Sequence, residues 1–319
     1  MKTSYKLKWL LFHSPVELFI RTAETFADEI KKLTDGRVEI EIWHLDDYQK
    51  TFLGNAPVDF FDLIKNNKIQ MSQIQTNHLG KNNATDFFAF DMPYLFKSHE
   101  HATRVLDGDI GDFLLESLPE SLNVRGLAFT YSGGYRCMAA KSPVTTADAF
   151  QGSTIGVRLS PVHTDLVTAI GAEANAVFDL IHEAPQSLDT SSNDFVQTTL
   201  PRYQAQINNA EHPYVINTRH NMFLTSIVIN EEIWNDLDAV DQDAFRKAAK
   251  YCAKLERQWS VDDAEFIENN KEKQAKLGIK EVIELSPEET QKLKDRTQPL
   301  YEKYNTVFSE GLLESIRKA

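Results

Sequence analysis

The sequence predicts an α/β protein built from two α/β domains, and three observations support this. The chain has 319 residues, more than one ordinary hydrophobic core serves, so two domains are expected. A strand–helix–strand pattern occurs near the N-terminus and again in the middle of the chain. No glycine- and serine-rich linker separates the two patterns, so we expect the chain to cross between the domains more than once and to form a hinge.

The N-terminal unit begins with a predicted strand over residues 5–12. Ser14-Pro-Val-Glu17 is a capping box with proline at the first helical position, so a helix is expected to follow. The alternating segment Val38–Trp43 supplies the next strand, which predicts a parallel pair joined by a right-handed crossover. Apolar residues at helical spacing form the expected buried stripe of this helix: Val16, Phe19, Ile20, Ala23, Phe26, Ala27, Ile30 and Leu33.

The second unit comprises a strand at Thr154–Leu159, a helix at Pro161–Ile170 and a strand at Ala174–Phe178. The other expected elements are a strand at Ile69–Ile74, a long helical stretch at Asp238–Lys276 interrupted once, a short strand at Ile279–Leu285, and a last helix capped by Ser286-Pro-Glu-Glu289.

Composition excludes several classes of protein. The formal net charge is −13, which argues against nucleic acid as the main partner. No apolar run is long enough to span a membrane. The apolar run Leu7–Phe12 is too short for a signal-peptide core, so either the protein is cytoplasmic or a leader has been removed. Cys137 and Cys252 are expected to be buried thiols rather than a disulfide.

Two arginines are the most informative residues. Arg136 lies in residues 133–140 and Arg158 in residues 155–159, and neither run contains another charged residue. Both runs are predicted strands, which places each guanidinium at or near the end of a sheet. A buried guanidinium needs an acceptor, because an unpaired buried charge is costly. Two acceptors remain open: a small anionic ligand, or one of the 47 aspartate and glutamate residues.

A ligand is expected at the carboxyl ends of the strands, in a cleft between the domains. The side chains that the predicted strands bring there are Phe12, His13, Gln73, Gln75, Asn77 and Arg158. No nucleophile, phosphate-loop or dinucleotide motif is present, so no enzyme is predicted. His99-Glu-His101 lacks the remaining ligands of a metal site and is expected to be a solvated helix start, so neither metal nor cofactor is predicted.

Segments spread over nearly the whole chain resemble the solute-binding proteins of tripartite ATP-independent periplasmic (TRAP) transporters, the DctP type. In chain order they are Thr34-Asp-Gly-Arg-Val38, Asp91-Met-Pro-Tyr-Leu-Phe96, Ser98-His-Glu-His-Ala102, Leu106-Asp-Gly108, Gly134-Tyr-Arg136, Val144-Thr-Thr-Ala-Asp148, Phe150-Gln-Gly152, Thr218-Arg-His220 and Ile229-Asn-Glu-Glu-Ile-Trp234.

The resemblance implies a type II-like periplasmic-binding-protein fold, with crossing strands and a long hinge helix around a cleft. Residues 1–132 with about 222–258 would form domain I, and residues 133–221 with about 259–319 domain II. It also implies a monomeric periplasmic protein whose leader has been removed. The domains would close on an organic acid, and the loaded protein would deliver it to a membrane-embedded TRAP permease.

The family's arginine position differs in this chain. The family usually has Gly-Leu-Lys-Ile-Arg-Val, in which the arginine grips the ligand carboxylate; residues 152–158 here are Gly-Ser-Thr-Ile-Gly-Val-Arg. Gly156 therefore stands in the place of that arginine. Arg158 comes two residues later, on the same strand face and displaced by about 6.5–7 Å. Arg136 matches the second arginine of some members directly.

The family's acidic site positions are neutral here. By the same resemblance, the family's Gln-Glu-Asn segment, which follows a buried Val-Asp-Gly, corresponds to residues 193–198. Its glycine is replaced by Phe195, its glutamate by Gln197 and its asparagine by Thr198, and the glutamate that some members have at the end of the third strand corresponds to Gln75. Neutral amides lower the repulsion of an anion and disfavour metal-assisted binding. The leading prediction is a binding protein for a small organic anion. A neutral or zwitterionic ligand, a sensor subunit and a cleft enzyme remain alternatives.

Overall fold

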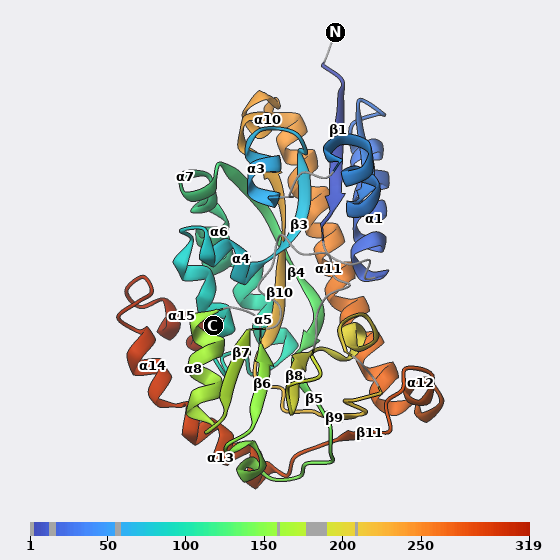
Figure 1. The fold of residues 1–319 in the computed structure, drawn as a ribbon. Helices are drawn as coiled ribbons and strands as arrows, with labels where there is room; N and C mark the ends of the chain where they lie inside the picture. Colours follow the sequence, from blue (N-terminus) through green and yellow to red (C-terminus); the bar gives the residue numbers. More distant parts are fainter. Residues whose placement is uncertain (1–2, 13–16, 55–58, 158–159, 177–189, 208–209) are drawn as a thin grey trace.

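The computed structural model describes residues 3–12, 17–54, 59–157, 160–176, 190–207 and 210–319 (Figure 1). Within them the chain forms two sheets, one above the other along the long axis of the molecule. The strand order is β2-β1-β3-β10-β4 in the first sheet and β11-β9-β5-β8-β6-β7 in the second. The predicted α/β class with two sheet-based halves is confirmed.

The first sheet carries the N-terminal unit. Its strands are β1 (Tyr5–Leu11), β2 (Val38–His44), β3 (Met71–Gln75), β4 (Val124–Tyr135) and β10 (Met222–Asn230). β1 pairs in parallel with β2 and β3, as the strand–helix–strand pattern predicts, and β10 runs antiparallel to β3 and β4. The carboxyl ends of β1 and β3 therefore lie at the same edge.

The connecting helix α1 (Glu17–Leu33) buries most of its predicted stripe. Leu33 was expected in the stripe but is 39% exposed, because it stands in the last helical position before the turn into β2. Leu18 and Thr22 are buried instead. Val16 and the capping residue Ser14 lie outside the described residues.

The second sheet carries the second unit. Its strands are β5 (Cys137–Ala140), β6 (Thr154–Val157), β7 (Glu173–Ala176), β8 (Phe195–Thr198), β9 (Tyr214–Ile216) and β11 (Glu281–Ile283). β6 is parallel to β7 and β8, and α8 (Pro161–Ala169) joins β6 to β7, as predicted. β5 runs antiparallel to β8 and β9.

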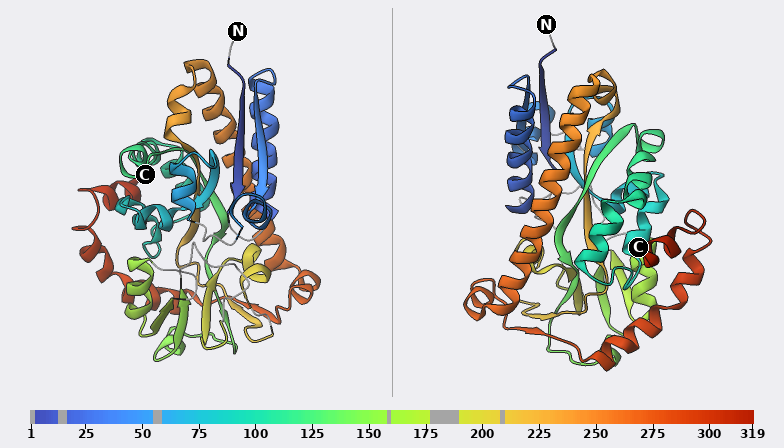
Figure 2. Two further views of the ribbon diagram at one scale, coloured as in Figure 1. Left: turned by 45° about the horizontal axis from the view of Figure 1, so that its top comes forward. Right: turned by 180° about the vertical axis from the view of Figure 1, so that it is seen from behind.

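Two connections and one long helix join the halves. β4 passes into β5 through Arg136, and the segment after β9 leads back into β10. α11 (Ala239–Asn269) runs beside α1 and continues along the length of the molecule (Figure 2). It ends at Asn270, which caps α12 (Lys271–Lys276), so the single interruption expected in this stretch is confirmed.

The other helices surround the sheets. They are α2 (Leu45–Tyr48), α3 (Phe60–Lys65), α4 (Thr76–Lys81), α5 (His99–Leu106), α6 (Asp109–Glu116), α7 (Leu118–Leu122), α9 (Tyr203–Gln206), α10 (Glu231–Asp236), α13 (Pro287–Thr297), α14 (Pro299–Tyr304) and α15 (Leu312–Lys318), with short π and 3-10 segments between some of them.

The C-terminal segment returns to the first half of the molecule. Ser286 caps α13 as predicted, but α13 is not the last helix, because α14 and α15 follow it. The carbonyl of Ile316 lies 2.7 Å from His101 Nε2. His101 is therefore buried against α15, which corrects the expectation of a solvated helix start. The domain boundaries given above remain a prediction.

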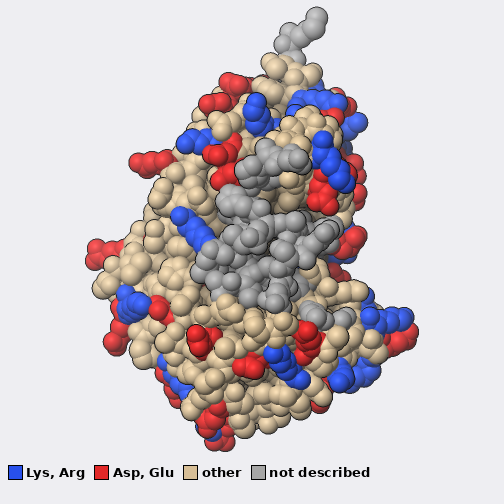
Figure 3. Space-filling view, in the orientation of Figure 1, with Lys and Arg blue, Asp and Glu red and all other residues tan. Residues whose placement is uncertain are grey.

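The surface and the cysteines agree with the composition. In the face shown in Figure 3, acidic and basic side chains are interspersed. No helix in the described part of the chain combines the length and apolarity needed to cross a membrane. Cys137 and Cys252 are both buried free thiols, as expected.

Candidate functional site

Arg136 lies at the junction of β4 and β5, where the chain passes from one sheet to the other. Its side chain is 1% exposed, and its guanidinium carbon stands 3.7 Å from the centre of the Phe223 ring. Its backbone N–H donates to the carbonyl of Asn221 at 2.8 Å. Among the described residues, Nε and Nη1 of the guanidinium have no hydrogen-bond partner. Burial lowers the pKa of Arg136 to about 10, although the nearby carboxylate of Asp91 opposes the shift.

A glycine pair creates this junction. Gly133 and Gly134 have φ angles of +92° and +77°, which L-residues with side chains rarely adopt. A Cβ on Gly133 would lie 2.2 Å from Thr199 Oγ1. The same hydroxyl donates to the carbonyl of Ser132 at 2.9 Å. The two glycines thus let the crossing strand approach the segment that follows β8.

Asp91 is a buried carboxylate beside Arg136. It is 2% exposed, and its Oδ1 lies 3.3 Å from His163 Nε2. Asn221 Nδ2 contacts both the Asp91 carbonyl and His163 Nε2, each at 2.9 Å. Burial alone would raise the pKa of Asp91, but His163, Arg136 and Ser160 together hold it below its ordinary value. Asp91 therefore supplies a negative charge next to the Arg136 guanidinium.

Gln197 joins the same group of polar side chains through His220. The Nε2 atoms of Gln197 and His220 lie 3.1 Å apart, and Thr218 Oγ1 lies 2.7 Å from His220 Nδ1. Burial, followed by the charges of Arg136 and His163, sets the pKa of His220 well below its ordinary value. His220 is thus a neutral hydrogen-bonding group here.

Arg202 is a second buried arginine in this region, and the sequence analysis missed it. It ends the 3-10 turn Leu200–Arg202 and is 2% exposed. Its guanidinium carbon lies 5.2 Å from the centre of the Phe223 ring, so both arginines stand against one phenyl group. Nη1 donates to Ser132 Oγ at 2.8 Å, whereas Nε has no hydrogen-bond partner within the residues that the structure describes. Burial and the neighbouring Arg136 lower the pKa of Arg202 to about 9.

A sequence signal for Arg202 was available. It is the only charged residue in residues 195–210, the same pattern that drew attention to Arg136. Arg136 and Arg158 were singled out because they lie in predicted strands. Arg202 instead follows Pro201 in a turn, so this second criterion did not apply to it.

Gln75 ends β3, whereas Asn77, expected to continue the period of two, lies in the first turn of α4. They are 1% and 2% exposed, and within the described residues the amide nitrogen and oxygen of each lack a hydrogen-bond partner. Gln75 lies opposite Thr225 in the antiparallel ladder, so Gln75 and Phe223 share one face of the sheet.

Gln73 was predicted to join Gln75 and Asn77 at the cleft, but its environment is different. Its Nε2 lies 2.8 Å from Thr130 Oγ1 and 2.8 Å from both carboxyl oxygens of Glu256 on α11. Gln73 therefore packs against the long helix.

The remaining predicted residues have separate surroundings. Thr198 is buried at the end of β8, opposite Cys137, the residue that follows Arg136 in the chain. Gly156 is buried in β6 and pairs with Val196 on β8. Phe12 is buried at the end of β1 and packs on Phe60, with ring centres 5.2 Å apart. His13 and Arg158 lie outside the described residues, so their predicted roles stay predictions.

The chemistry of this site is that of binding. Guanidinium groups and primary amides provide fixed hydrogen bonds to an anion and to neutral polar groups. Within the described ranges, no group of three or more histidine, cysteine, aspartate or glutamate side chains is placed to hold a metal ion.

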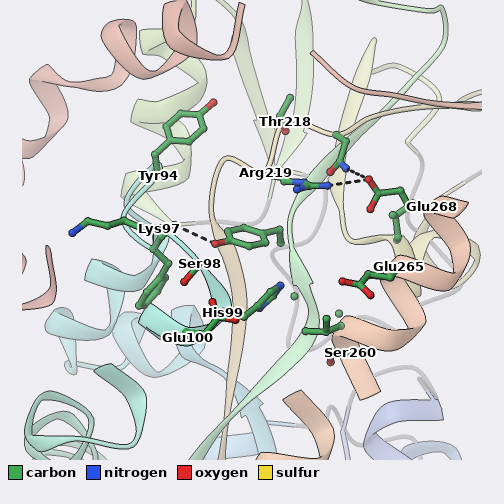
Figure 4. A pocket seen from close by; sticks show the side chains of 18 of the residues that line it. Tyr94, Lys97, Ser98, His99, Glu100, Thr218, Arg219, Ser260, Glu265 and Glu268 are labelled. Atoms are coloured by element: carbon green, nitrogen blue, oxygen red, sulfur yellow. Dashed lines mark hydrogen bonds and ion pairs between the residues drawn. The ribbon is translucent and has the colours of Figure 1, made fainter. Parts of the chain in front are cut away.

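A separate pocket of about 580 Å³ lies between β4, α5, α11 and α13 (Figure 4). His99, Ser260 and Glu265 are among the side chains around it, and Arg136 and Arg202 are not. Arg219 lines this pocket and pairs with Glu268 at 2.9 Å. Because that guanidinium already has a carboxylate and is half exposed, the pocket makes a weaker anion site than the buried arginines.

Comparisons with known proteins match this architecture. Residues 12–306 match the family described as bacterial extracellular solute-binding protein, family 7 (DctP). A solute-binding protein of Chromohalobacter salexigens is 25% identical over 93% of this chain and 83% of its own length. The C4-dicarboxylate-binding periplasmic protein DctP of Rhodobacter capsulatus is 26% identical, over 93% and 85%.

Solved structures agree with the fold. A TRAP periplasmic solute-binding protein from Chromohalobacter salexigens with bound D-glucuronate superposes with a TM-score of 0.80 at 23% identity, covering 99% of each chain.

Proposed function

This chain belongs to family 7 of the bacterial extracellular solute-binding proteins, and from that premise we propose that it captures a small organic anion for a TRAP transporter. The anion binds between the two sheets, next to Arg136. The loaded protein then delivers it to the membrane-embedded permease, in the periplasm. Relatives support the ligand class, since one is named for C4-dicarboxylates and a structural neighbour holds D-glucuronate.

The observation that carries the proposal is the state of Arg136. Its guanidinium is buried, and two of its three nitrogens lack a hydrogen-bond partner in the described ranges of the chain. A planar guanidinium matches a carboxylate in geometry and charge, and the match is strongest where water is excluded. An organic carboxylate therefore satisfies the donors that the protein leaves open.

The two-sheet architecture supports capture by closure. The halves are joined by the β4–β5 crossing, the return into β10 and the helix α11, none of which is a flexible linker. Such connections permit a hinge motion that encloses a ligand.

A thermal-shift screen of organic acids tests this function, with succinate, D-glucuronate and D-galactonate included. A bound acid should stabilise the protein by about 3–4 kcal/mol at 100–1,000 times its dissociation constant. Solution scattering should show compaction with the same acid.

Two outcomes would count against the proposal: no acid raises the melting temperature, or only amines and uncharged sugars do. Recovery of the acid unchanged after release separates binding from catalysis. Adjacent genes for two membrane subunits would favour transport over sensing.

A further inference from the structure

We propose that Arg202 is the principal anion-binding residue of this site and that the ligand is a hydroxylated carboxylate. The inference rests on the proposed function, because it assigns a residue and a ligand chemistry within the same site. The sequence analysis gave that role to Arg158, at a position shifted from the family's arginine. Arg202 comes from a different segment, the turn that follows β8.

The charge of Arg202 lacks a counter-charge in the described part of the protein. Arg136 has Asp91 beside it, and the two charges influence each other. The one charged neighbour that acts on Arg202 among the described residues is Arg136, which repels it. Its one hydrogen bond there goes to the neutral hydroxyl of Ser132. A guanidinium buried to this degree requires an anion, and a bound carboxylate provides one.

Arg202 and Arg136 are placed to act on one ligand. Both guanidinium groups stand against the Phe223 ring, at 5.2 Å and 3.7 Å from its centre. Ser132, which accepts from Arg202, is four residues before Arg136 in the same crossing segment. Gln75 shares the sheet face of Phe223. The geometry thus gathers two cations and an open amide at the carboxyl edge of the first sheet.

The open amides indicate hydroxyl groups on the ligand. Both polar atoms of Gln75 and of Asn77, and Oε1 of Gln197, are buried and have no hydrogen-bond partner in the part of the chain that the structure describes. A hydroxyl both donates and accepts, so it can satisfy the nitrogen as well as the oxygen of an amide. An apolar ligand would leave these groups unpaired, which is costly for buried polar atoms.

The experiment compares Arg202→Met with Arg257→Met by calorimetry and thermal melting. Arg257 is a matched control, since it is also buried but donates to Asp107 Oδ1 at 2.9 Å, away from this site. The probes are D-glucuronate and D-galactonate. Two partial analogues of D-glucuronate complete the set: D-glucose, in which a hydroxymethyl group replaces the carboxylate, and cyclohexanecarboxylate, which lacks the hydroxyls.

Arg202→Met should weaken binding of the hydroxylated acids at least about 30-fold and leave the melting temperature of the ligand-free protein equal or higher. Arg257→Met should lower that melting temperature and keep the affinity. Wild-type protein should bind D-glucose and cyclohexanecarboxylate at least about tenfold more weakly than the hydroxylated acids. Retained affinity in Arg202→Met, or a lower ligand-free melting temperature, would overturn the assignment. Preferred binding of cyclohexanecarboxylate, or of succinate alone, would overturn the ligand class.

Failure of the proposed function gives a different result. If wild-type protein binds no organic acid in the screen, that function fails. Arg202 is then judged with formate, the smallest carboxylate, at tens of millimolar. Formate should raise the melting temperature of the wild type and not that of Arg202→Met. Equal responses would refute an anion site at Arg202.

Discussion

Arg257 and Arg202 are both buried arginines, but their charges are accommodated differently. Arg257, on the long helix α11, donates to the carboxylate of Asp107 and, at 3.1 Å, to the carbonyl of Phe129. Arg202 donates to Ser132 Oγ, and within the described residues no carboxylate stands beside it. The charge of Arg257 is thus neutralised within the protein by the carboxylate of Asp107. Under the proposal made above, Arg202 is left for a ligand, so a buried arginine with no carboxylate beside it among the described residues would mark where the ligand binds.

Glu256, one residue before Arg257, shows a third way in which a buried ionisable group is accommodated. It is fully buried, and its carboxyl oxygens lie 2.8 Å from Gln73 Nε2. Burial raises the pKa of Glu256 to about 8, so near neutral pH this group keeps its proton. Two neighbouring residues on α11 therefore avoid an unpaired buried charge in different ways. Glu256 stays neutral by keeping its proton, and Arg257 pairs with the carboxylate of Asp107.

After the loss of Arg202, removal of Arg136 should have the largest effect on binding. Arg136→Ala should weaken anion binding by about 2–4 kcal/mol, as the loss of a buried charged partner does. Calorimetry measures the affinity. Arg136→Lys should recover only part of the loss, because an ammonium lacks the planar fork. Unchanged affinity in the alanine variant would show that Arg136 has a structural role, like Arg257, and does not bind the ligand.

Removing Arg257 should instead affect folding. Arg257→Met should lower the free energy of unfolding by about 2–3 kcal/mol, because it strands the buried Phe129 carbonyl and breaks the pair with Asp107. Urea denaturation of the ligand-free protein provides the measurement. If the stability is unchanged, Arg257 does not stabilise the fold, and the proposed difference between Arg257 and Arg202 does not hold.

The protonated state of Glu256 gives a dependence on pH. Between the ordinary glutamate pKa of 4.5 and about 8, the folded protein holds a proton that the unfolded chain releases. Stability should therefore fall as pH rises through this window, by up to about 1.4 kcal/mol per pH unit from this group. Glu256→Gln keeps a neutral side chain and should flatten that fall, so the variant gains on the wild type most near pH 8. Parallel denaturation profiles for the two proteins from pH 5 to pH 8 would contradict the assignment.

The smallest effect is expected at Arg158. If Arg202 holds the anion, Arg158→Ala should change the affinity for D-glucuronate by less than about 1 kcal/mol, because the ligand carboxylate would not depend on Arg158. The affinities of Arg158→Ala and Arg202→Met for D-glucuronate should be measured side by side by calorimetry. A large loss in Arg158→Ala with full affinity in Arg202→Met would restore the displaced-arginine hypothesis.

The sequence predicted the parallel strand units, the long helix α11 and the burial of Arg136, because each depends on local periodicity or on a local absence of charge. The pair of Asp91 and His163 was not predictable in this way, since over seventy residues separate the two partners. Gln73 and Gln75 were correctly placed on one strand face. Which of them packs under α11 depends on where the helix crosses the sheet, and periodicity does not encode that position.

The acidic surface has a kinetic consequence. The cations of the site are buried, whereas the chain carries a formal charge of −13 and exposes acidic side chains among basic ones (Figure 3). An approaching anion therefore meets the repulsion of the whole molecule before it meets either guanidinium. Dissolved salt screens that long-range repulsion, with a Debye length of about 8 Å at physiological ionic strength, and acts less on the buried contacts. Association of an organic anion should accordingly become faster as salt is added, opposite to the usual response of an attractively steered pair.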